Sequence, residues 1–150
     1  SLLPDPESYL LLIAGKDHPG LHTLNTKFQI RHWGYLNSQE QLNEFYSLAD
    51  LLVNPSVYET FGLTNVEAMA CGTPVAAFPV CTMPELITKA SGWLASDVSA
   101  EGLADVIQLA FSSPQELHDK GISSRHLVET TFDESNMLDQ FEDLYERALL

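Results

Sequence analysis

Short apolar runs alternate with stretches in which apolar residues recur every three or four positions. Residues 9–14 form a continuous apolar run that ends at Gly15. Residues 51–53 form a second apolar run, within a predicted strand at 51–54 that is stopped by Pro55. Runs of this length, bounded by Gly or Pro, are typical of strands buried inside a sheet. The pattern therefore predicts two buried strands in the first third of the chain.

A helical pattern begins at Ser38, between these two runs. Residues 38–41 read Ser-Gln-Glu-Gln, the pattern of a capping box, and the apolar residues that follow fall on one helical face. That face comprises Leu42, Phe45, Tyr46 and Ala49. The same reasoning predicts strands at residues 28–33, 74–78 and 92–95, a short helix at 65–71, a helical turn at 84–89, and helices at 100–111, 114–130 and 134–149.

The order of these elements indicates the fold class. Short buried strands that alternate with helices imply a parallel sheet with helices on both faces. The chain shows no internal repeat, low-complexity tract or linker. We therefore predict that residues 1–150 form one Rossmann-like α/β domain with a helical C-terminus.

Composition and charge narrow the functional classes. The 150 residues are 45% hydrophobic and 19% charged, which is ordinary for a globular domain, and no apolar run approaches the ~20 residues of a membrane span. The N-terminus has no signal-peptide pattern, and Cys71 and Cys81 suit reduced thiols, so we expect a cytoplasmic protein. The net charge of −14 disfavours nucleic acid and anionic lipid as partners.

The segment from Asn54 to Val75 carries the candidate chemistry. A strand ends near Pro55, a loop runs to about Leu63, and a helix follows. In open α/β sheets, ligands bind beyond the carboxyl ends of the strands, and the free N–H groups of a helix N-terminus favour an anion such as phosphate. Gly62 would allow a ligand to approach the backbone closely.

Two carboxylates in this segment need a different role, because a carboxylate repels phosphate. Glu59 and Glu67 are hydrogen-bond acceptors and suit paired hydroxyl groups. A nucleotide sugar, with a diphosphate between a ribose and a hexose, would satisfy both features. Two alternatives stay open: Glu67 ends a Thr-Asn-Val-Glu capping-box pattern that starts at Thr64, and Glu59 also suits a solvated loop position.

The ordered set of motifs resembles retaining glycosyltransferases of the group 1, or family 4, type. Their mark is two Glu separated by seven residues, here Glu59 in Glu-Thr-Phe-Gly-Leu and Glu67 in Glu-Ala-Met-Ala-Cys-Gly-Thr-Pro-Val. Residues 45–50, 30–36 and 83–86 resemble the flanking motifs of that family. The resemblance implies the C-terminal, donor-binding half of a GT-B fold, which has two Rossmann-like domains.

The resemblance also implies roles for individual residues in binding a nucleotide-diphosphate sugar. Glu67 would hold the ribose hydroxyls, and Glu59 would be the catalytic-site residue that contacts the donor hexose. The turn at Gly34 and Tyr35 would lie against the base. The substrate-binding set is completed by the backbone around Phe61, Gly62, Leu63 and Thr64. No cofactor is implied beyond the donor substrate itself.

The chain also departs from the family pattern. Members carry an Arg and a Lys in a first strand-turn-helix unit, and residues 1–5 resemble the end of that unit, so the unit and the acceptor-binding N-terminal domain are expected partners outside this sequence. An unfilled sheet is expected to recruit a second copy, giving a homodimer or an aggregate. The resemblance is also compatible with a role in polysaccharide biosynthesis and with membrane association of the complete enzyme.

A metal site and two other functions compete with this interpretation. His18 and His22 have a metal-like spacing, but Pro19 and Gly20 between them favour a loop, and no metal site is predicted. A non-catalytic nucleotide-sugar-binding or interaction module and, with less support, a nucleotide-sugar epimerase are the alternative functions. The isolated chain is expected to be inactive in transfer.

Overall fold

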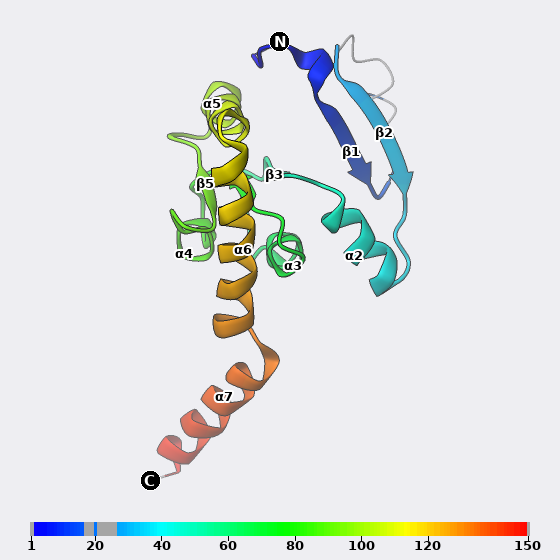
Figure 1. Ribbon diagram of the computed structural model, residues 1–150. Helices are drawn as coiled ribbons and strands as arrows, with labels where there is room; N and C mark the ends of the chain where they lie inside the picture. The colour runs from blue at the N-terminus through cyan, green and yellow to red at the C-terminus, as the bar shows by residue number, and fades with distance from the viewer. Residues whose placement is uncertain (1, 17–19, 21–26, 150) are drawn as a thin grey trace.

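The computed structural model describes residues 2–16, 20 and 27–149, and its elements follow the predicted alternation of strands and helices (Figure 1). After a short 3-10 helix, Pro6–Ser8, the elements are β1 (Leu10–Ala14), β2 (Gln29–Gly34), α2 (Gln39–Ser47), β3 (Leu52–Asn54), α3 (Leu63–Ala70), β4 (Val75–Ala77), α4 (Met83–Leu86), β5 (Gly92–Leu94), α5 (Ala100–Ser112), α6 (Pro114–Thr131) and α7 (Glu134–Ala148). Each predicted strand and helix is present, which confirms the α/β fold class.

The described strands form two parallel sheets, where the alternation predicted one. β1 pairs with β2, and the second sheet has the order β3-β4-β5. In a doubly wound sheet the first strand lies in the middle, with the second and third on one side and the fourth to sixth on the other. The two observed groups match those two sides. Among the described strands, none joins β1 to β3.

The core surrounds β4, which is buried on both faces. Val75 and Ala77 pack with residues of α3, α4 and α6, whereas Ala76 packs with residues of α5 and β5. Alternate residues of a strand point to opposite faces, so these two clusters show that helices cover both faces of the three-stranded sheet. This part of the chain is the layered α/β domain that the apolar pattern predicted.

β1 differs from the prediction of a buried strand. Leu10 and Leu11 are 51% and 42% exposed, although their apolar run suggested burial on both faces. The β1–β2 pair meets the rest of the molecule through ring contacts, among them Tyr9 with Phe111 at 5.2 Å between centroids, and through a hydrogen bond from Gln108 to the Leu2 carbonyl. A strand is buried only where other elements cover it, and the apolar pattern of β1 does not show whether such elements are present.

α7 extends away from the body and buries none of its residues (Figure 1). Its apolar residues, such as Phe141 and Tyr145, lie on one face and are exposed. Among the described residues, no helix combines the length and the apolar character that crossing a membrane requires.

Candidate functional site

The loop between β3 and α3 is anchored at both ends by buried amide side chains. Asn54, the last residue of β3, accepts a hydrogen bond from the Ser56 backbone N–H at 2.9 Å and donates to the side chain of Asn65 at 3.0 Å. Asn65 lies in the first turn of α3 and is fully buried. Because buried amides are costly unless paired, this contact fixes the end of the strand relative to the start of the helix.

Gly62 begins α3 as its N-cap residue, with a φ of 88°. A Cβ at this position would lie 2.7 Å from the Asn65 amide nitrogen and 2.7 Å from the Met83 methyl carbon. Only glycine adopts this backbone conformation without strain and fits this space. The N–H groups of the following helical residues therefore start from a tightly packed, glycine-specific turn.

Replacing Gly62 with alanine is expected to lower the free energy of unfolding by about 2–4 kcal/mol, because left-handed strain and overpacking add. Gly34→Ala is a matched control, since Gly34 has a φ of 74° but no atom within 4 Å of an added Cβ. Urea unfolding of both variants measures the difference. Equal losses would show that packing around Gly62 contributes nothing.

Glu67 is held by a tyrosine and does not cap its helix. The Tyr46 hydroxyl of α2 donates to Glu67 Oε2 at 2.8 Å. Since α3 begins at Leu63, with Gly62 as the N-cap, Glu67 stands more than one turn inside the helix. The capping-box alternative for Thr64 and Glu67 is therefore wrong: glycine takes the cap because its φ is positive.

Glu59 is half-buried in the loop, and its Oε1 accepts a hydrogen bond from the Thr60 backbone N–H at 3.1 Å. Its side chain lies beside Gly62, since a Cβ on that glycine would be 3.4 Å from Glu59 Cγ. The structure thus places Glu59 next to the N-terminus of α3. The remaining oxygen sites of its carboxylate can accept hydrogen bonds from a ligand.

The other loop residues differ in exposure. Phe61, Leu63 and Thr64 are exposed, whereas Gly62 is buried. The Phe61 ring packs edge-on against Phe132 at 5.8 Å, and its carbonyl accepts from Thr82 Oγ1 at 3.3 Å. These contacts hold the loop while leaving the first backbone N–H groups of α3 beside exposed side chains.

Gly34 and Tyr35 lie at the end of β2, and both are exposed. Among the described residues, no hydrogen bond or ring contact joins either one directly to the loop of residues 59–63. The neighbouring Trp33 packs against Phe45 at 5.8 Å, and Phe45 packs against Tyr46 at 5.9 Å. A continuous row of side chains therefore runs from the end of β2 to the Glu67 carboxylate.

Comparison with known proteins identifies the family. The family model for glycosyl transferases group 1 matches residues 2–126. The chain belongs to this family. It is 34% identical over 114 residues to N-acetyl-alpha-D-glucosaminyl L-malate synthase of Bacillus anthracis, a match that covers 74% of this chain and 29% of the relative.

Solved glycosyltransferase structures share the fold. Sucrose-phosphate synthase from Thermosynechococcus elongatus superposes with a TM-score of 0.81 at 31% identity over 93% of this chain and 38% of that one. The Anabaena protein HepE, solved in complex with UDP-glucose, has a TM-score of 0.74 at 23% identity, covering 91% and 40%. The chain spans less than half the length of these relatives, and it corresponds to the C-terminal domain of a group 1 glycosyltransferase of the GT-B fold.

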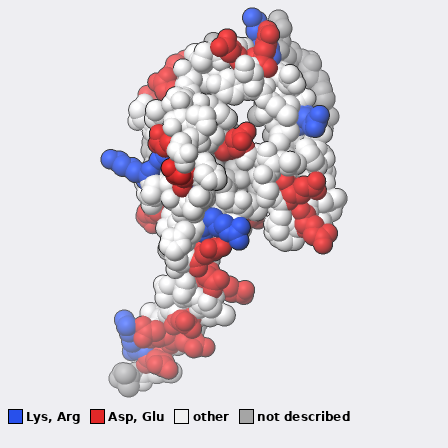
Figure 2. All heavy atoms as spheres, viewed as in Figure 1, with Lys and Arg blue, Asp and Glu red and all other residues white. Residues whose placement is uncertain are grey.

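Basic side chains are missing from the sequence around the site of this glycosyltransferase domain. No Lys or Arg occurs between Arg31 and Lys89, a segment that includes both β3 and α3. Figure 2 shows acidic side chains in groups over the visible face and along α7, with few basic ones between them. Charge balance for a diphosphate would have to come from backbone N–H groups and from cations outside this segment.

The described residues hold no group of three potential metal ligands. His18 and His22, considered for a metal site from the sequence, lie outside the described residues.

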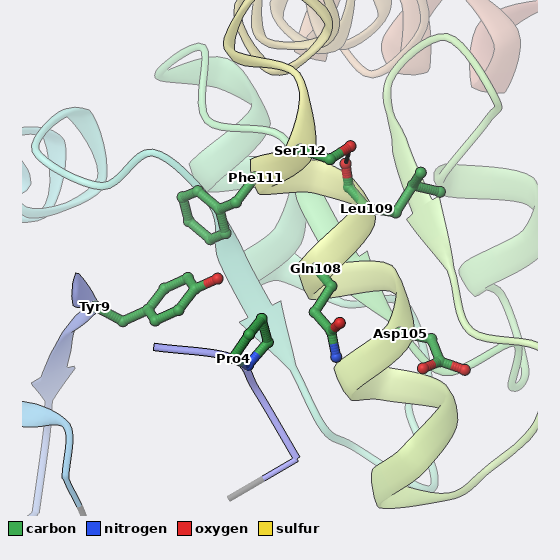
Figure 3. A pocket seen from close by; sticks show the side chains of 7 residues that line it. All are labelled: Pro4, Tyr9, Asp105, Gln108, Leu109, Phe111 and Ser112. Carbon is green, nitrogen blue, oxygen red and sulfur yellow. Dashed lines mark hydrogen bonds between the residues drawn. The ribbon is translucent and has the colours of Figure 1, made fainter. Parts of the chain in front are cut away.

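An open pocket of about 520 Å³ lies away from the motif (Figure 3). Its walls come from Pro4 and Tyr9 near the start of β1 and from one side of α5, where Asp105 is the one acidic residue of the lining. It lies at the amino end of β1, whereas Glu59 and Glu67 follow the carboxyl end of β3. The candidate site remains the one predicted from the motif, and this pocket is separate from it.

Three residues that support the site were not singled out from the sequence. Asn54 and Asn65 are polar residues at positions that the fold buries, and the apolar pattern places Tyr46 on the apolar face of its helix. The hydroxyl of a buried tyrosine normally has a hydrogen-bond partner. The predicted burial of Tyr46 was therefore the one sequence feature that pointed to such a contact. The identity of that partner depends on tertiary structure.

Proposed function

We propose that this chain is the donor-binding domain of a retaining glycosyltransferase that transfers a hexose from a nucleotide-diphosphate sugar. The observation that carries the proposal is α3 itself, which begins at Gly62 and carries, more than one turn later, Glu67 with its carboxylate held by Tyr46. An anionic centre flanked by hydroxyl-rich groups is complementary to that arrangement. HepE, which shares the fold, is a protein solved with UDP-glucose.

Each part of the donor has a proposed contact. Glu67 accepts hydrogen bonds from the ribose hydroxyls, and Glu59, the proposed catalytic-site residue, accepts them from the hexose. Backbone N–H groups from Phe61 to Thr64 face the diphosphate and the sugar, and the turn at Gly34 and Tyr35 lies against the base. The row from Trp33 to Tyr46 supports the relative placement of the base contact and the ribose contact.

The proposed chemistry depends on orientation and electrostatics. The domain would hold the anomeric carbon in place and stabilise the departing diphosphate while positive charge develops at that carbon. Because residues 32–88 contain no Lys or Arg, cations for the diphosphate would come from a first strand-turn-helix unit, and the acceptor from an N-terminal domain. We further propose a cytoplasmic, family 4 enzyme of polysaccharide biosynthesis that needs no cofactor.

Nucleotide binding tests the proposal. Calorimetry of the chain with UDP, GDP and ADP should show saturable binding of at least one of them, with 2′-deoxynucleotides binding more weakly. No hexose transfer from the matching nucleotide sugar is expected from the chain alone. Absence of binding for all three nucleotides would contradict the donor-binding function, and transfer by the chain alone would contradict the need for further domains.

A further inference from the structure

Tyr46 is the one residue of α2 that is buried, and its hydroxyl group is directed to a carboxylate. It is 7% exposed, and its hydroxyl donates to Glu67 Oε2 at 2.8 Å. An ionised carboxylate only accepts hydrogen bonds, so the phenol must be the donor. The contact joins α2 to α3, two helices that are adjacent in the fold but separated by β3 in the sequence.

The phenol is kept in its donating form. Burial raises the pKa of Tyr46, and the hydrogen bond to Glu67 and the negative charge of that carboxylate raise it further. Tyr46 therefore stays protonated throughout the physiological pH range. A second polar contact of the same residue is independent of the hydroxyl, because Thr73 Oγ1 donates to the Tyr46 backbone carbonyl at 2.7 Å.

These contacts separate two tasks of Tyr46. The ring and the backbone carbonyl attach α2 to the core, where Phe45 packs edge-on against the Tyr46 ring. The hydroxyl donates to Oε2 of Glu67, and within the described part of the chain no hydrogen bond occupies Oε1, which can accept from another donor. A carboxylate has about four lone-pair sites, so one phenol leaves enough for a pair of vicinal hydroxyls.

We infer that Tyr46 is a positioning residue for ribose recognition: its hydroxyl fixes the Glu67 carboxylate so that Oε1 is presented to the 2′- and 3′-hydroxyls of a nucleotide. This inference rests on the proposed function, because it requires that Glu67 binds the ribose. Tyr46 itself does not touch the nucleotide. It acts by restricting the rotation of the Glu67 side chain, which would otherwise lose conformational freedom on binding.

Tyr46→Phe tests the inference because it removes the hydroxyl alone. Phenylalanine keeps the ring packing and the backbone contact to Thr73, so the variant is expected to fold. Affinities for UDP, 2′-deoxy-UDP and 3′-deoxy-UDP are measured by calorimetry for the parent and the variant. UDP binding should weaken on the order of 10-fold, the effect of one hydrogen bond to a charged group, while binding of the deoxynucleotides changes little.

Tyr9→Phe is the matched control, since Tyr9 also packs against a phenylalanine, at 5.2 Å, but near the start of β1. It should leave all three affinities unchanged. A purely structural role of Tyr46 would weaken the three nucleotides equally and lower the melting temperature in parallel, which would overturn the inference.

The outcomes distinguish this inference from the proposed function. If the parent prefers UDP to its deoxy forms and Tyr46→Phe keeps that preference, Glu67 binds ribose without help from Tyr46, and only the present inference fails. If the parent binds UDP without any preference for ribose hydroxyls, the ribose role of Glu67 fails and this inference fails with it. A parent that binds GDP or ADP in place of UDP is tested with the 2′- and 3′-deoxy forms of that nucleotide, and a parent that binds none of UDP, GDP and ADP contradicts the proposed function and this inference together.

Discussion

Replacing Glu67 with alanine is expected to weaken UDP binding by about 10- to 100-fold, because charged hydrogen bonds contribute about 1.5–3 kcal/mol each. The free energy of unfolding should fall by only about 1–2 kcal/mol, the cost of leaving the Tyr46 hydroxyl without its acceptor. Calorimetry measures the affinity, and urea unfolding measures the stability. Binding is thus expected to suffer more than folding.

Two further variants make this experiment specific. Glu44 lies on the exposed surface of α2, so Glu44→Ala removes the same charge from the domain and should change neither property. Glu59→Ala should weaken UDP-glucose binding while sparing UDP, since its proposed contact is the hexose. If Glu67→Ala binds UDP as well as the parent does, Glu67 does not hold the ribose.

The chain alone is expected to form dimers or larger assemblies in sedimentation experiments. Among the described strands, β1 and β3 each pair with a strand on one side only, so their other edges present backbone N–H and C=O groups. Such edges recruit strands from other molecules. The half-exposed Leu10 and Leu11 add apolar surface at β1.

A parallel strand supplied between β1 and β3 should suppress the association. A longer chain that carries the first strand-turn-helix unit of the family should sediment as a monomer and melt at a higher temperature. Leu2→Glu, at a side chain that is 52% exposed, provides no such strand and serves as a control for a gain in solubility through added negative charge alone. A monomeric parent whose melting temperature does not respond to the added unit would show that the two sheets are complete as they stand.

The local parts of the fold were predictable from the sequence because they depend on near neighbours. Ser38 caps α2 as its motif predicts, and its side chain accepts from Gln41 N. Gly72 follows the end of α3 with a φ of 81°, as expected of a C-terminal glycine. The start of α3 was predicted too late, because Gly62 with its positive φ takes the cap that the Thr64 pattern suggested.

The remaining features depend on contacts that are distant in sequence. Apolar runs predict strands but not which strands pair, so one sheet was expected where the described residues form two. Glu59, Gly62 and Glu67 stood out through their spacing, whereas Tyr46 lies 21 positions from Glu67 and its hydroxyl partner became evident only in three dimensions. The exposure of Leu10 likewise depends on packing by elements that are distant in the sequence. A local sequence pattern does not predict such packing.

The row of side chains from Trp33 to Glu67 links the β1–β2 pair to the proposed ribose contact. A nucleotide that contacts both Tyr35 and Glu67 would bridge the two sheets, which share few contacts otherwise. Its binding free energy would then include the unfavourable entropy of restricting motion between the two sheets. Since such coupling is reciprocal, any change that rigidifies the attachment of β1–β2 would also tighten nucleotide binding, even far from the ligand.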